Sequence, residues 1–137
     1  MNANHVGALY PDHFGNFVVA QASGPTYLGA TGNAVNTLAQ FNNSSYIVRR
    51  ITVANARGSV AAANVTILTT SDGNTSNAVT NAATLTTVTA ATKFQDLPLS
   101  TTAASTVYTG SLYVYVGTAA AANNAVDITV YGDVVTL

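Results

Sequence analysis

The residues best suited to metal or acid–base chemistry lie at the beginning of the chain. His5, Asp12 and His13 form the only cluster of imidazole and carboxylate groups in the 137 residues. A histidine ligand needs a second group to orient its ring and a backbone that holds the geometry. The surrounding stretch has no sustained period that would supply either. We interpret it as a polar part of a docking segment, with a divalent-metal site as the alternative, and expect no bound metal or cofactor.

The other acidic residues are too dispersed to suggest catalysis. Glutamate and cysteine are absent, and four aspartates are spread over the second half of the chain, at positions 72, 96, 127 and 133. Asp72 follows the chemistry of a turn. Thiol catalysis and disulfides are therefore excluded, and neither a glycosidase carboxylate pair nor a Gly-x-Ser-x-Gly motif is present. We expect a protein that is not an enzyme and has no small-molecule substrate.

A nucleotide or nucleic-acid partner is not supported either. The glycines of "GPTYLGATGN", residues 24–33, lack the lysine and the following helix of a phosphate-binding loop, so they are turn residues. The formal net charge is −1, with four cations in the whole chain, which gives no steering toward polyanions.

Two of those four cations are adjacent, in the strand-like stretch "YIVRRITVAN" at residues 46–55. Regular alternation would place Arg49 on the face of Ile51 and Val53, and Arg50 on the opposite face. An apolar face requires a partner for Arg49, so we predict a structural ion pair with Asp96, Asp127 or Asp133. We predict that Arg50 lies at an interface, on the face that also carries Tyr46, Val48 and Thr52.

Three tyrosines in the last two predicted strands could also form a binding surface. Tyr113 and Tyr115 alternate with buried valines, and Tyr131 takes the outward position of the last strand. If these two strands pair, the rings form one patch that suits a protein interface or a sugar-binding platform. The alternative is that they pack against other parts of the fold.

The positions of these residues depend on an all-β domain. Runs rich in β-branched residues, separated by Gly, Asn, Asp and Pro turns, predict strands near 16–22, 35–41, 46–55, 61–70, 84–89, 92–97, 105–119 and 126–137. No amphipathic helix is evident, and "TAAAANNA" is interpreted as a loop. We predict an antiparallel β-sandwich of jelly-roll type over residues 26–137, with a possible bulge at Gly132.

Residues 1–25 are expected to form an extended N-terminal arm. Their large apolar side chains would anchor the arm on its own domain or on a neighbour: Leu9, Tyr10, Phe14 and Phe17. No stretch reaches the roughly 18 apolar residues of a membrane span, and no signal peptide is evident. The core is expected to be thin, because Ala and Val dominate and Trp is absent, so burial against other copies or a scaffold would add stability.

The segments "YIVRRITVANARGSVAAANVTILTTSDG", "TLTTVTAATKFQDLPLSTT" and "SLYVYVGTAAAANNAVDITVYGDVV" resemble a recurrent type of small structural protein of tailed bacteriophages. The resemblance covers roughly residues 46–135 and is closest to the capsid decoration, or cement, proteins. It implies a domain, often trimeric, that binds the major capsid protein on the outside of the virion.

The resemblance implies synthesis in the host cytoplasm and a role in stabilising the lattice by bridging capsid subunits. A first alternative is a phage tail, fibre or baseplate module that binds host-surface glycans through the tyrosines. A second is a shell, pilus or surface-layer subunit that assembles alone.

Overall fold

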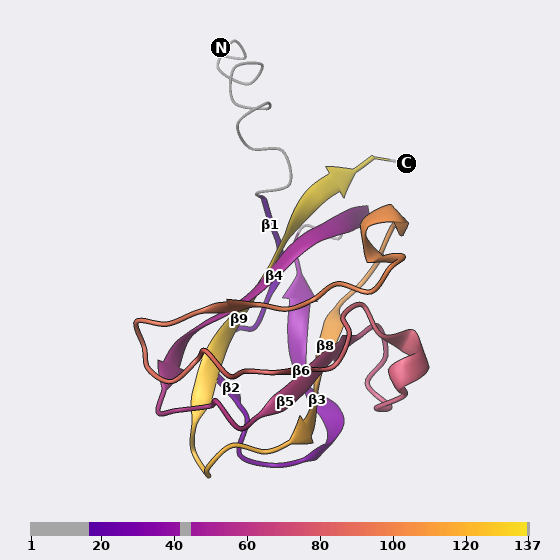
Figure 1. Cartoon of the computed structure of the whole chain (residues 1–137). Coiled ribbons are helices and arrows are strands. Elements are labelled where there is room, and N and C mark those ends of the chain that lie inside the picture. Colours follow the sequence, from indigo (N-terminus) through magenta and orange to yellow (C-terminus); the bar gives the residue numbers. More distant parts are fainter. Residues whose placement is uncertain (1–16, 42–44, 137) are drawn as a thin grey trace, which may run out of the picture.

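The computed structural model describes residues 17–41 and 45–136, which form an antiparallel all-β structure, as predicted (Figure 1). Its strands are β1 (Phe17–Gln21), β2 (Thr26–Tyr27), β3 (Gly32–Gln40), β4 (Ser45–Arg57), β5 (Asn64–Leu68), β6 (Ala83–Thr84), β7 (Gln95–Asp96), β8 (Leu112–Thr118) and β9 (Ala125–Val135). Two short 3-10 turns complete it, η1 (Thr75–Asn77) and η2 (Ala103–Ser105). No helix in this part of the chain is long and apolar enough to cross a membrane.

The strands belong to one curled sheet in the order β6-β5-β8-β3-β1-β9-β4-β7, with β2 paired to β9. The short pairing of β1 with β3, at Ala20 opposite Gln40, joins the two halves. Because the sheet curls, the β5–β8–β3 half faces the β9–β4 half across the core, as in a β-sandwich (Figure 1). The jelly-roll connection pattern remains a prediction.

On the side of the curled sheet between β5 and β4, segments outside the long strands fill the gap. The Val79 amide donates to Ile67 O at 2.8 Å, which places residues 77–81 beside β5. The Ser100 amide donates to Val79 O, and the Leu97 amide donates to Ile51 O of β4, both at 2.8 Å. Backbone hydrogen bonds therefore connect β5 to β4 through residues 77–81 and 97–100.

The predicted strands at 84–89 and 92–97 are wrong in extent, since only β6 and β7 form there. Between them the chain crosses from one half of the sheet to the other and buries Leu85 and Val88. The Gln95 side chain holds the crossing by donating to Thr84 O at 2.9 Å and accepting from the Thr87 amide at 3.2 Å. The buried residues of this segment therefore cover the core and do not form a long strand.

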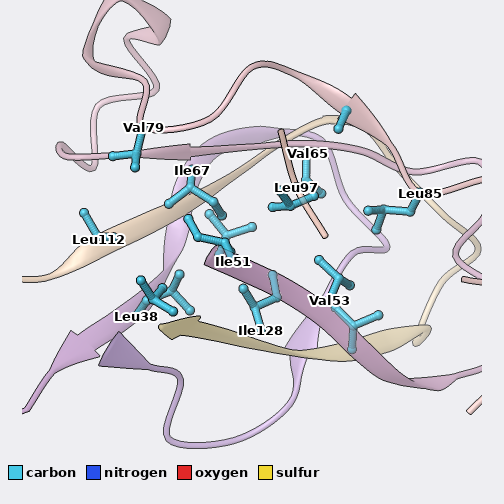
Figure 2. Close-up of a cluster of buried hydrophobic side chains, with 14 of the residues drawn as sticks. Leu38, Ile51, Val53, Val65, Ile67, Val79, Leu85, Leu97, Leu112 and Ile128 are labelled. Carbon is cyan, nitrogen blue, oxygen red and sulfur yellow. The ribbon is translucent and has the colours of Figure 1, made fainter. Parts of the chain in front are cut away.

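The core between the two halves is built mainly from Val, Leu, Ile and Ala. Figure 2 shows side chains from both halves meeting there, among them Ile67 from β5, Ile51 from β4 and Ile128 from β9. The largest fully buried side chain is Tyr46, whose hydroxyl donates to Gly110 O at 2.8 Å. Tyr46 therefore belongs to the core, and its predicted place on an outer face was wrong.

A bulge in β4 explains that error. Val48 lies opposite Gly132 and Arg50 lies opposite Tyr131, so Arg49 is the extra residue. An extra residue reverses the alternation, and the buried set becomes Tyr46 and Val48 before the bulge and Ile51 and Val53 after it. A bulge was expected at Gly132 of β9, and the extra residue instead lies on the facing strand, β4. Arg49 and Arg50 therefore stand between the two buried pairs of β4, and neither belongs to the core. The prediction that the two arginines lie on opposite faces of the strand was wrong.

Residues 17–21, inside the range expected for the arm, form β1 in the middle of the sheet. β1 pairs with β3 on one side and with β9 on the other. Leu9, Tyr10 and Phe14, and the His5, Asp12 and His13 cluster, lie outside the described residues.

Candidate binding surfaces

Most of the charge in the described chain gathers on one side of the sheet, the outer face of β4 and β9 with the adjoining β7. We call this surface the ionic face and define it by three arginines and three aspartates: Arg49, Arg50, Arg57, Asp96, Asp127 and Asp133. In β9 the aspartates alternate with the buried Ile128 and Val130, which fixes their outward direction.

Arg49 is the most embedded cation of the ionic face. Its Nε donates to Asp133 Oδ2 at 2.7 Å, and its Nη1 donates to the carbonyl oxygen of Ala104 at 3.1 Å. Of the three predicted partners, Asp133 is therefore the one in contact. The Arg49 guanidinium therefore links β4 to both β9 and η2. The bulge in β4 is what directs the side chain toward these two partners.

Arg50 is engaged within the chain as well. Its Nε lies 3.0 Å from both carboxylate oxygens of Asp96, and its guanidinium carbon is 5.6 Å from the ring centre of Tyr131. Thr52 Oγ1 also donates to Asp96, at 2.7 Å. These contacts hold β7 on β4, so the predicted interface residue has a structural role on its own chain.

The third pair of the ionic face lies at the far end of β4. Arg57 Nη2 is 3.7 Å from Asp127 Oδ1, and the Asn55 side-chain Nδ2 donates to Asp127 Oδ2 at 2.7 Å. Asn55 has a φ of 53°, in the left-handed region that asparagine tolerates, and marks a second register shift in β4. The ionic face is thus neutralised pair by pair, and it offers no basic stripe for a polyanion.

The three predicted tyrosines do not form one patch. β8, with Tyr113 and Tyr115, pairs with β3 and β5, whereas β9, with Tyr131, pairs with β1, β2 and β4. Tyr113 lies opposite the buried Leu68. All three rings are half-buried beside their cross-strand neighbours, so the condition for a joint platform is not met.

A different apolar surface occurs at the end of the sheet where β1 begins and β9 ends. Four large apolar side chains there are between 41 and 55 % exposed: Phe17, Phe41, Val107 and Val134. We call these four residues the apolar end.

The pairing of their strands brings the four residues to the same end. Phe17 lies opposite Gly132, two residues from Val134, and the Phe41 amide donates to Val19 O at 3.0 Å. Val134 lies opposite Tyr46, which exchanges backbone hydrogen bonds with Tyr108, next to Val107. Phe17, predicted as an anchor, thus lies at the apolar end.

A cleft of about 480 Å³ opens at the other end of the sheet. We call it the Tyr27 cleft; it is lined by Tyr27, Gly29, Ala30, Thr31, Asn36, Val114, Val116, Ala122 and Asn123. The Tyr27 side chain is 56 % exposed, while Val114 and Val116 are buried. Hydrogen bonds tie the two flanking loops together, from the Leu28 amide to Asn124 O at 3.0 Å and from the Ala120 amide to Leu28 O at 2.8 Å.

The lining also shows how tightly the backbone is held around the cleft. A Cβ on Gly29 would lie 3.0 Å from the Ala122 Cα, tighter than an ordinary contact. Asn123 has a φ of 68°, and the Asn36 side-chain amide donates to Tyr27 O at 3.4 Å. The cleft is therefore shaped by backbone that other parts of the fold hold in place.

Among residues 17–41 and 45–136, no three His, Cys, Asp or Glu side chains gather in a group that could hold a metal ion. Asp72 has the turn role predicted for it. Its carboxylate accepts from Thr70 Oγ1 at 2.6 Å and from the Asn74 amide at 2.9 Å, and these bonds lower its pKa.

The apolar end and the Tyr27 cleft were both missed by reasoning from the sequence, apart from Phe17. Tyr27 was visible only as a single aromatic residue within a Gly- and Thr-rich turn, and Asn123 as part of a loop. Their proximity depends on the pairing of Tyr27 with Ala125, between strands about 100 positions apart, which no local pattern indicates. No known protein family, curated protein or solved structure matches this chain.

Proposed function

We propose that this protein is a capsid decoration protein of a tailed bacteriophage, located on the outside of the virion. It would bind the major capsid protein and stabilise the lattice by bridging neighbouring subunits. The observation that carries the proposal is the apolar end: four large apolar side chains, each about half exposed, gathered at one end of a domain with little charge. The sequence resemblance over residues 46–135 supports the same class.

The apolar end suits a protein partner better than solvent. Clustered exposed apolar groups on a small domain commonly mark interaction sites. The sequence before Phe17 contains three further large apolar residues, Leu9, Tyr10 and Phe14. A subunit that binds only the assembled lattice stabilises it by mass action, and several copies per capsid make weak contacts sufficient.

Co-sedimentation with capsids tests the proposal. Purified protein is mixed with expanded capsids that lack it, and the bound fraction is measured for wild type, Phe41→Ser and Val134→Ser. We expect both variants to bind at least about threefold more weakly, since binding buries only the exposed half of each side chain, which is worth about 0.7–1.5 kcal/mol. Phe94→Ser is the control, because Phe94 is 56 % exposed and lies outside the apolar end.

The proposal fails if wild-type protein does not sediment with capsids, or if Phe94→Ser weakens binding as much as Phe41→Ser. The resemblance also implies a homotrimer, which sedimentation equilibrium of the free protein measures. Spontaneous growth into large particles would instead favour a self-assembling shell or surface-layer subunit.

A further inference from the structure

We propose that the Tyr27 cleft binds a short, neutral saccharide. The inference is independent of capsid binding, because the cleft and the apolar end lie at opposite ends of the sheet. β9 begins at Ala125, opposite Tyr27, and ends beyond Gly132, opposite Phe17 (Figure 1). A ligand in the cleft would therefore remain accessible on a protein held by its apolar end.

The size and framework of the cleft suit a small ligand. Its volume of about 480 Å³ falls within the range of roughly 300–1,000 Å³ in which small-molecule sites occur. The Leu28 and Ala120 hydrogen bonds hold the two flanking loops, so the walls are largely formed before a ligand arrives.

The lining has the two kinds of surface that a sugar ring needs. A pyranose presents a face of C–H groups and a rim of hydroxyls. Tyr27 offers the apolar surface: it is 56 % exposed, so its ring is available for stacking, and the buried Val114 and Val116 form the floor beneath it. The carboxamides of Asn36 and Asn123 supply both donors and acceptors, and Thr31 supplies a hydroxyl.

The absence of charge from the lining selects among saccharides. None of the described residues that line the cleft is Asp, Lys, Arg or His. An acidic sugar would lose hydration without gaining a cationic partner, which costs free energy. The preferred class is therefore neutral hexoses and their short oligomers, in contrast to sialylated or sulfated glycans.

Titration of the full-length protein with neutral mono- and disaccharides, followed by amide NMR shifts, tests this inference. We expect saturable shifts for residues around Tyr27, Thr31, Asn36 and Asn123. Tyr27→Ala should weaken binding by about tenfold or more, since it removes the stacking ring, and Tyr27→Phe should stay within about threefold. Phe94→Ala is the matched control, because Phe94 is equally exposed and lies outside the cleft.

The melting temperature of each variant shows whether it is folded. The inference is overturned if no neutral saccharide shifts the cleft resonances of the wild-type protein, or if folded Tyr27→Ala binds as tightly as wild type. Stronger binding of sialylated or sulfated glycans on an array would also overturn it. A shift caused only by peptides with apolar side chains would reassign the cleft to a protein partner.

Discussion

Arg49 and Arg50 are neighbours in the chain, but different amounts of the fold depend on them. Arg49 contacts Asp133 of β9 and the Ala104 carbonyl of η2, so its guanidinium holds three parts of the structure together. Arg50 contacts Asp96 of β7 and the Tyr131 ring from a more exposed position. Solvent screens the second pair more than the first.

We predict that Arg49→Ala lowers the free energy of unfolding by about 1–2 kcal/mol, because a partly buried carboxylate and a carbonyl each lose a hydrogen bond from the guanidinium. Arg50→Ala should lower it by less than about 1 kcal/mol, the usual value of an exposed ion pair. Urea denaturation of both variants measures the difference. A larger loss for Arg50→Ala would mean that β7 contributes more than the joint at η2.

Tyr46 links the core to alkaline stability. Burial, with a smaller contribution from Tyr108, raises the pKa of Tyr46 from 10.0 to about 12. In the unfolded chain the phenol loses its proton near the lower value, so between pH 10 and 12 the unfolded state binds fewer protons than the folded state. Its contribution is complete below pH 10 and is lost as the pH rises toward 12.

We predict that Tyr46→Phe costs about 1 kcal/mol near neutral pH, through loss of the hydrogen bond to Gly110 O. The variant should also lose stability less steeply between pH 10 and 12. Some slope should remain, because burial also raises the pKa of Tyr108. Urea midpoints over this pH range measure it, and an unchanged slope would place the alkaline transition elsewhere.

At the scale of elements, the bulge in β4 and Gly132 of β9 form one unit. A Cβ at position 132 would overlap the carbonyl oxygen of Ile47 on the facing strand. The close approach of the two backbones therefore requires glycine, and it occurs next to the shift that turns Arg49 away from the core.

We predict that Gly132→Ala destabilises the protein by at least about 1–3 kcal/mol, because the β4–β9 backbones must separate. Gly24→Ala is the matched control: its Cβ would meet nothing within 4 Å, and its stability should be unchanged or slightly higher. Thermal unfolding compares the two. A Gly132→Ala variant as stable as the control would show that the strands can part without cost.

The strands that could be predicted from the sequence are those with long β-branched alternation. Residues 46–55 and 126–137 correspond to β4 and β9, which form the longest ladder. The crossing between β6 and β7 was not predicted, because its Thr- and Val-containing sequence is typical of strands, whereas its buried Leu85, Val88 and Leu97 cover the core. Apolar periodicity reports burial and does not report which backbone groups pair.

The apolar end, the Tyr27 cleft and the ionic face depend on pairings between strands that are far apart in the sequence. Local sequence patterns therefore did not predict most of them. The bulge at Arg49 depends on Gly132, more than 80 positions away, so alternation read along β4 alone gave the wrong faces. The tyrosine patch required β8 to pair with β9, and the sheet instead separates them by β3 and β1. What the sequence did indicate was that Arg49 needs an acidic partner.

At the scale of the whole molecule, the charges are few and mostly paired. Three ion pairs occupy the ionic face, and the formal net charge is −1. Long-range attraction to a capsid would therefore be weak, and binding would come from apolar burial at the apolar end.

We predict that the affinity for capsids changes less than about threefold when salt is raised from about 0.05 to 0.5 M, over which the Debye length falls severalfold. Co-sedimentation at several salt concentrations measures this. A fall of about tenfold or more would point to charged contacts, and the ionic face would then replace the apolar end as the candidate surface.

The position of the first and last described strands has a practical consequence for peptide display. β1 starts and β9 ends as neighbours, with Phe17 opposite Gly132, so cargo fused near either strand end would crowd the apolar end. The loop at residues 119–124 lies at the opposite end and is exposed at Ala121, Ala122 and Asn123. A foreign epitope inserted there would point away from a partner docked at the apolar end, whereas one inserted at the start of β1 or the end of β9 would lie beside it.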